Sequence, residues 1–179
     1  MAGNTKTLNE LIAALRNASP VLRMRAAESL GRCALTLEGA VSAVPALVGV
    51  LNDVNGLVRM HSVIALGHIG CSEHDALVVP AIVNTLKDSQ AHVREYSAWA
   101  LGRIGPGAAE AIPDLATVLT KDSWEPARKC SAWALGQIGP AARDAAPVLL
   151  AATADSNQDV RLAAKGALSI LGNGLKGHM

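Results

Sequence analysis

The sequence has few large aromatic residues and almost no net charge. Among its 179 residues there are no Phe, one Tyr and three Trp, although half of the chain is hydrophobic. A thick core built on aromatic rings is therefore excluded, and small aliphatic side chains must do the packing. Sixteen basic and fifteen acidic residues give a formal net charge of +1. This balance disfavours a strong general attraction to nucleic acid or anionic lipid.

Cysteines and long apolar runs are also scarce. Cys33, Cys71 and Cys130 are odd in number and widely spaced, with no C-x-x-C pair. This pattern disfavours a secreted disulfide framework. No segment approaches the roughly eighteen uninterrupted apolar residues of a membrane span, and the N-terminal residues lack the apolar stretch of a secretory signal. We therefore expect a cytoplasmic protein without membrane spans.

The chain consists instead of repeats. The segments "VRMHSVIALGHIG", "VREYSAWALGRIG" and "ARKCSAWALGQIG" share one pattern, and "LRMRAAESLGRCA" and "VRLAAKGALSILG" are degenerate copies at the two ends. Their arginines lie at Arg23, Arg59, Arg94, Arg128 and Arg161, so successive spacings are 36, 35, 34 and 33 residues by subtraction. Such a period predicts stacked supersecondary units. We expect a single array over residues 1–172, with units at about 5–36, 37–71, 72–106, 107–140 and 141–172, and a tail or expression remnant at 173–179.

Each unit is predicted to contain two helices. Apolar and small residues after Val93 follow the spacing of a helix that is buried on one side. Prolines mark the first turn of the first helix, at Pro45, Pro80, Pro113 and Pro147. Glycines mark the end of the second helix, at Gly70, Gly105, Gly139 and Gly172. Four further glycines lie inside the second helix, at Gly31, Gly67, Gly102 and Gly136. Each should cost about 0.8–1 kcal/mol relative to Ala, so we expect a neighbouring helix backbone to approach closely there.

Taken together, these residues resemble HEAT repeats, specifically the short bacterial type that also occurs in phycobilisome lyases. The resemblance covers about residues 5–172 and implies an all-α, right-handed α-solenoid of five two-helix units. Its most specific mark is an Asp six residues before the Arg, a pair that in HEAT arrays forms a ladder between neighbouring units. The predicted structural ladder comprises Asp53 and Arg59, Asp88 and Arg94, Asp122 and Arg128, and Asp155 and Arg161. Asn17 takes the place of the Asp before Arg23, so we expect the first rung to lose charge assistance.

One face of the second helices is left free by the core. Counting the first residue of each Val-Arg pair (Val, Leu or Ala) as position 0, positions 2, 3, 6 and 10 point away from the buried stripe. The resemblance implies that this side is concave. Three of the four Trp and Tyr residues fall on it, and Trp124 lies in a nearby turn. Exposed rings among apolar neighbours are typical of binding surfaces; alternatively, the rings fold back over the Ala-rich helices and extend the core. The predicted partner-binding residues are Ile64, His68, Tyr96, Trp99, Arg103, Trp124, Lys129 and Trp133.

The last unit carries apolar or small residues where a terminal unit should be polar, namely Leu162, Ala163, Gly166 and Ile170. We expect either a longer array or self-association through this repeat.

No pattern in the sequence predicts catalysis. His68, Cys71 and His74 could donate to zinc, but they lie across a helix end without a second ligand pair. There is no phosphate-binding loop and no nucleophile elbow, and the His-Glu dipeptides of di-iron HEAT hydroxylases are absent. We therefore predict a non-enzymatic scaffold or adaptor that binds a protein partner, with no cofactor and no metal.

Two alternatives stay open. One is a nucleic-acid-binding protein similar to HEAT-like DNA glycosylases, which the weakly positive face disfavours. The other is a phycobilin lyase-like subunit.

Overall fold

The computed structural model describes residues 2–34, 39–70 and 74–173. Within these residues there are ten α-helices, three 3₁₀ helices and no strands. The α-helices are α1 (Ala2–Ala14), α2 (Pro20–Arg32), α3 (Val44–Gly49), α4 (Gly56–Ile69), α5 (Asp75–Thr85), α6 (Ala91–Ile104), α7 (Ile112–Lys121), α8 (Glu125–Ile138), α9 (Ala146–Ala152) and α10 (Gln158–Asn173). The 3₁₀ helices are η1 (Ala40–Ala43), η2 (Gly105–Ala111) and η3 (Gly139–Ala145).

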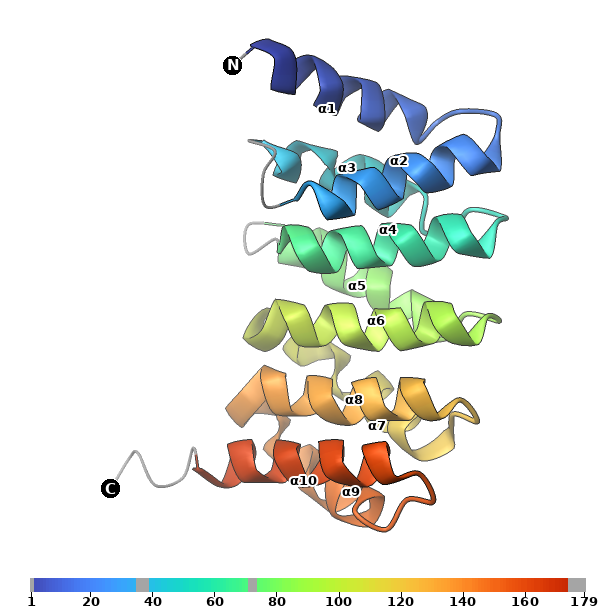
Figure 1. Cartoon of the computed structure of the whole chain (residues 1–179). Coiled ribbons are helices and arrows are strands. Elements are labelled where there is room, and N and C mark those ends of the chain that lie inside the picture. The colour runs from blue at the N-terminus through green and yellow to red at the C-terminus, as the bar shows by residue number, and fades with distance from the viewer. Residues whose placement is uncertain (1, 35–38, 71–73, 174–179) are drawn as a thin grey trace.

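The helices form a stack of pairs. Helices α2, α4, α6, α8 and α10, the second helices of the units, run side by side in one layer, and α3, α5, α7 and α9 lie behind them (Figure 1). Each second helix packs on the second helix of the next unit. The predicted all-α solenoid is therefore confirmed.

Small side chains build the core, as the composition requires. One leucine recurs at the same place in four consecutive second helices, and all four copies are fully buried: Leu30, Leu66, Leu101 and Leu135. Many other buried side chains of these helices are Ala, among them Ala65, Ala98, Ala100, Ala132 and Ala134. Ala65, Ala100 and Ala134 lie against a glycine of the preceding second helix. Because alanine projects only a methyl group, adjacent helix backbones can approach closely.

The glycines inside the second helices lie at these contacts. A Cβ atom added at Gly31 would lie 3.1 Å from the Cα atom of Ala65 in the next helix, and one added at Gly136 would lie 2.9 Å from the Cα atom of Ala167. Backbone atoms cannot move away as a flexible side chain can. The expected close approach explains why glycine recurs despite its low helix propensity.

Three of the four prolines stand where the sequence predicts, while one proline and one predicted helix end do not. Pro45, Pro113 and Pro147 stand in the first turn of α3, α7 and α9. Pro80 instead lies inside α5, because the segment before it is α-helical, whereas η1, η2 and η3 precede the other prolines. Gly172 also departs from expectation: it lies within α10 and is not among the glycines with positive φ. The expected tail, apart from residue 173, falls outside the described residues.

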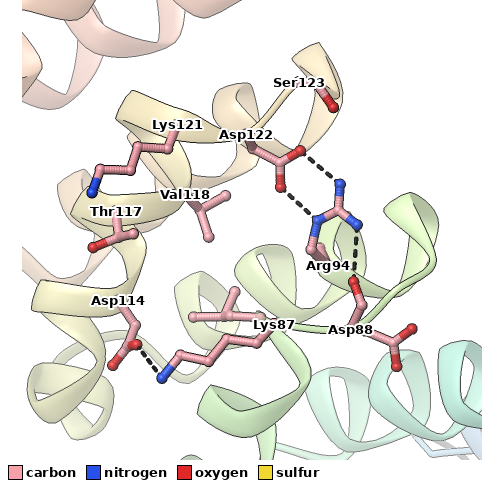
Figure 2. Close-up of a pocket in the computed structure, with 10 residues that line it drawn as sticks. Lys87, Asp88, Arg94, Asp114, Thr117, Val118, Lys121, Asp122 and Ser123 are labelled. Carbon is pink, nitrogen blue, oxygen red and sulfur yellow. Dashed lines mark hydrogen bonds and ion pairs between the residues drawn. The ribbon is translucent and has the colours of Figure 1, made fainter.

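An arginine–aspartate ladder joins the units along one edge of the stack. The Nε and Nη2 atoms of Arg94 donate to the two carboxylate oxygens of Asp122 at 2.6 and 2.7 Å, and Nη1 donates to the backbone oxygen of Asp88 at 2.9 Å. Figure 2 shows this rung beside a second ion pair, Lys87 with Asp114 at 2.9 Å. Each arginine thus holds the turn before its own helix and the carboxylate of the following unit. The same pattern repeats in the pairs Arg23–Asp53, Arg59–Asp88 and Arg128–Asp155.

The two ends of the ladder differ from the sequence-based expectation. Arg23 forms a full bidentate pair with Asp53, at 2.6 and 2.9 Å, so the expectation of a weakened first rung is wrong. The partner carboxylate comes from the next unit, and Asn17 contributes only its backbone oxygen to Arg23. Arg161 donates to the backbone oxygens of Asp155 and Ser156. In the part of the chain that the structure describes, Arg161 has no carboxylate partner.

Candidate protein-binding face

The exposed face of the second helices carries most of the predicted partner-binding residues. We call it the second-helix face. α4 contributes Ile64 and His68; α6 contributes Tyr96, Trp99 and Arg103; α8 contributes Lys129 and Trp133. Arg103 and Lys129 are exposed, and the others are half-buried.

Trp99 is the centre of one cluster. The ring of His68, from the preceding unit, meets the Trp99 ring edge-on with centroids 5.1 Å apart, and Tyr96 makes a similar contact at 6.4 Å. The guanidinium carbon of Arg103 lies 5.8 Å from the centroid of the Trp99 ring, within the range of a cation–π interaction. The structure therefore brings three of the other predicted residues together around the Trp99 indole.

The indoles lie across the glycines of the preceding helix. A Cβ atom added at Gly67 would lie 2.7 Å from the Trp99 ring, and one added at Gly102 would meet the Trp133 ring. Both rings also pack against the core residues, so part of each ring extends the core. Neither Trp99 nor Trp133 is sealed, because both residues stay partly exposed. Each ring thus has a packed side and a free side.

An apolar pocket of about 490 Å³ opens between α6, α8 and α10. Its lining consists of Trp99, Lys129, Cys130, Trp133, Asp159, Leu162 and Ala163. Two of the predicted tryptophans are therefore walls of one concavity. Sequence reasoning did not find this pocket, and it assigned Leu162 and Ala163 only to the open end of the array. The sequence does carry an indication of the pocket, because the side chain at position 3 becomes smaller along the array: α6 has Tyr96 there, whereas α8 has Cys130 and α10 has Ala163.

Trp124 lies apart from this pocket, at the N-cap of α8. Its indole nitrogen donates to Oε2 of Glu95 at 3.0 Å, and the ring of His92 meets it edge-on at 5.2 Å. Its hydrogen-bonding capacity is therefore already used within the protein. Ile64 occupies the position in α4 that corresponds to Trp99 and lies one unit further toward the N-terminus.

A second hollow, of about 370 Å³, lies among the ladder residues (Figure 2). Asp88, Arg94 and Asp122 of the ladder contribute to it, as do Lys87 and Asp114. Lys87 pairs with Asp114, Arg94 with Asp122, and Asp88 with Arg59, so these five side chains hold the unit junction together. Lys121 also lines the hollow and is exposed.

The pKa shifts identify structural carboxylates and an inert thiol. Hydrogen bonds from Arg23 and Arg128 lower the pKa of Asp53 and Asp155 below the usual 3.8. Burial is the largest single effect on Asp88 and Asp122 and raises their pKa, but the arginine hydrogen bonds, a backbone hydrogen bond and the nearby arginine charges together outweigh it, so the pKa of each is also lowered. Burial, with Glu95 nearby, raises the pKa of Cys130 to about 11. The Cys130 thiol is thus protonated at neutral pH and is a poor nucleophile.

The described residues contain no group of three or more His, Cys, Asp or Glu side chains that could hold a metal ion. The cluster considered from the sequence includes Cys71, which lies outside those residues. Over the same described ranges, no helix is both long and apolar enough to span a bilayer.

Comparisons with known proteins agree with this architecture. The family model of HEAT repeats matches residues 8–79, 44–136 and 79–169. No curated protein sequence matches the chain.

Among solved structures, the chain is similar to an engineered protein, with a TM-score of 0.76, 24% identity, and coverage of 93% of this chain and 80% of the other. It is also similar to the complex of CpcE and CpcF of phycocyanin lyase from Nostoc sp. PCC7120, with a TM-score of 0.75, 26% identity, and coverage of 93% and 65%. A designed armadillo repeat protein in complex with the peptide (KR)4 has a TM-score of 0.75, 22% identity, and coverage of 92% and 81%. The family model and the stacked helix pairs lead to the same conclusion: the chain belongs to the HEAT-repeat family.

Proposed function

We propose that this protein is a non-enzymatic scaffold or adaptor that binds a protein partner on its second-helix face, and that it does so in the cytoplasm. The observation that carries the proposal is the apolar pocket walled by Trp99 and Trp133. Large rigid rings at a concave apolar site are the usual anchors of protein interfaces. The likeness to a designed armadillo protein in complex with a peptide supports the fold's suitability for this role.

The hydrogen-bonding state of the two indoles also supports binding. Within the described residues, the indole N–H groups of Trp99 and Trp133 have no acceptor in the protein. Neither group is among the buried polar atoms without a partner, so both are accessible. Each is therefore a donor open to an incoming acceptor. Tryptophan is effective at interfaces because it combines a large apolar area with one hydrogen-bond donor.

The test is a quantitative capture experiment. The wild-type protein and the Trp99→Ala/Trp133→Ala variant are immobilised at equal density, and the bound proteins are compared by mass spectrometry and then measured by calorimetry. Trp124→Phe serves as the control, since Trp124 lies outside the pocket. We expect one partner to lose at least tenfold in affinity for the double variant while binding the control nearly normally. Equal binding to all three folded proteins would contradict the proposal.

A phycobilin lyase-like role is the second candidate, and the similarity to the CpcE–CpcF complex is the observation that favours it. Its test is direct: a bilin mixed with the protein should change its absorbance spectrum, and Trp99→Ala/Trp133→Ala should abolish the change. An unchanged spectrum would remove this candidate.

Nucleic-acid binding is the weaker alternative. On the second-helix face Arg32 lies near Glu28 at 3.9 Å and Lys129 near Asp159 at 3.4 Å, so part of its positive charge is already compensated. We expect no retention of duplex DNA in a filter-binding salt series.

Self-association through the last repeat is a separate proposal. Leu150, Leu162 and Ile170 are exposed by 64, 58 and 46%, and two of them lie on α10. Light scattering over a concentration series tests it, and a constant monomer mass would contradict it.

A further inference from the structure

The pocket between α6, α8 and α10 is a local departure from the repeat. At position 3 of the second helix, α6 carries Tyr96, but α8 carries Cys130 and α10 carries Ala163. The two smaller side chains leave the space that Trp99, Trp133 and Leu162 enclose. A volume of about 490 Å³ lies in the lower part of the range for ligand pockets, roughly 300–1,000 Å³. It suits one large side chain with its adjoining backbone.

Among the charged groups around the pocket, some have a charged partner and some do not. Lys129 lies 3.4 Å from Asp159 at the rim, and Glu95 accepts the Trp124 indole N–H and lies 3.3 Å from His92. Arg103 is exposed and, within the described ranges, takes part in no ion pair. Arg103 is therefore a cation beside the pocket that can pair with a carboxylate of a partner.

Arg103 is also held in place. Its guanidinium lies 5.8 Å from the centroid of Trp99, the ring that forms one wall of the pocket. A guanidinium that rests on a ring keeps its N–H groups free at the edge for a carboxylate, and less side-chain freedom is lost when the pair forms.

We propose that the pocket receives one large apolar side chain of an extended partner segment, and that a carboxylate next to that side chain pairs with Arg103. This inference rests on the proposed function and specifies the partner's chemistry: a hydrophobic anchor flanked by acidic residues. Basic segments are disfavoured, because they would place like charge beside Arg103.

The three tryptophans provide the readout. In a ¹⁵N-labelled protein each indole N–H gives its own signal, so Trp99 and Trp133 report on the pocket and Trp124, bound to Glu95, is an internal control. The probes are the peptides acetyl-Gly-Glu-Phe-Glu-Gly-amide, its Gln-Phe-Gln and Lys-Phe-Lys counterparts, and a Glu-Ala-Glu version without the anchor.

We expect the Glu-Phe-Glu peptide to shift the Trp99 and Trp133 signals while the Trp124 signal stays in place. The Gln counterpart should bind about two- to fivefold more weakly at low salt, the effect of an exposed ion pair. The Lys counterpart should bind more weakly still, and the Ala version should cause no shift.

Two variants separate the anchor from the charge. Arg103→Gln changes an exposed side chain and should make the Glu and Gln peptides bind equally without abolishing binding. Ala163→Tyr places in α10 the side chain that α6 has at this position and should fill the pocket, so that no peptide shifts the indole signals. Circular dichroism checks that both variants keep their helices.

The inference is overturned if the Gln and Lys peptides bind as well as the Glu peptide, or if no peptide shifts the two signals. Either result leaves the proposed function standing, because that function is decided by the capture experiment with Trp99→Ala/Trp133→Ala.

Discussion

The two glycines Gly102 and Gly166 should respond in opposite ways to the same substitution. Both lie inside a second helix, where replacing Gly by Ala stabilises the helix by about 0.5–1 kcal/mol when the space is open. A Cβ atom at Gly166 would have no neighbour within 4 Å. We therefore expect Gly166→Ala to raise the free energy of unfolding by this amount.

Gly102→Ala should lower the free energy of unfolding instead. Its Cβ atom would meet the Trp133 ring, with Cε3 at 2.7 Å, and the Cα atom of Ala134 at 2.9 Å. The ring can tilt, but the backbone of α8 can move only together with its contacts to α6 and α10. Overpacking of this kind costs about 1–3 kcal/mol. After the gain in helix propensity, a net loss of up to about 2.5 kcal/mol is left. Since both variants gain the same propensity, they should differ by the overpacking cost, about 1–3 kcal/mol.

The measurement is urea unfolding followed by far-ultraviolet circular dichroism. Gly102→Ala in a Trp133→Ala background is the matched control, since it removes the ring contact and keeps the contact with Ala134. The loss on adding the Cβ atom should be smaller in that background, but not zero. If Gly102→Ala stabilises the protein as much as Gly166→Ala does, the close approach of α6 and α8 is not what requires glycine there.

The ladder and the free thiol support three further predictions. Arg128→Gln should destabilise the protein by about 1–3 kcal/mol more than Arg161→Gln, because Arg128 pairs with Asp155 whereas Arg161 has no carboxylate partner among the described residues. Urea unfolding of both variants tests this, and equal losses would contradict it. The ladder aspartates have a lowered pKa when folded, so their contribution should be complete at neutral pH and should decline as the pH falls below the unfolded value of about 4; melting temperatures that stay constant down to pH 3 would refute this. The Cys130 thiol, with a pKa of about 11, should react with iodoacetamide about a hundredfold more slowly in the folded protein than in urea, because two pKa units reduce the thiolate a hundredfold; peptide mapping by mass spectrometry gives both rates.

Much of the fold could be predicted from the sequence, because the same residue types recur at the same positions of each repeat and therefore indicate the same contacts. Gly67 and Gly102 would be ordinary defects if they occurred once, but recurrence at one position indicates a shared contact, and the structure places a neighbouring backbone there. Pro80 shows the limit of this reasoning. A helix tolerates proline in its first turn and, at a cost in stability, in its interior. Which of the two applies depends on whether the preceding segment is α-helical.

The pocket was harder to foresee than the tryptophans that line it. Periodicity places Trp99 and Trp133 on one face, but a pocket depends on the difference in volume between neighbouring units. Cys130 and Ala163 carry that information only when they are compared with Tyr96 at the equivalent position. The partner of each ladder arginine was also hard to predict. Asp53 lies six residues before Arg59, but that spacing does not show which aspartate the arginine binds: the guanidinium group of Arg59 donates to Asp88 of the next unit.

The same ladder distinguishes the two ends of the array. A ladder aspartate does two things: one oxygen accepts the backbone N–H two residues further on, as Asp53 does from Asn55 at 2.8 Å, and both oxygens receive the arginine of the preceding unit. Asn17 keeps the first role, accepting from Ser19 at 2.9 Å, and its amide cannot supply the charge that the second requires. A second copy stacked head-to-tail on α10 would therefore offer Arg161 a neutral amide. Self-association in that register would lack the arginine–aspartate ion pair that is present at the four junctions within the array. A tight junction at α10 therefore requires a partner that supplies a carboxylate to Arg161.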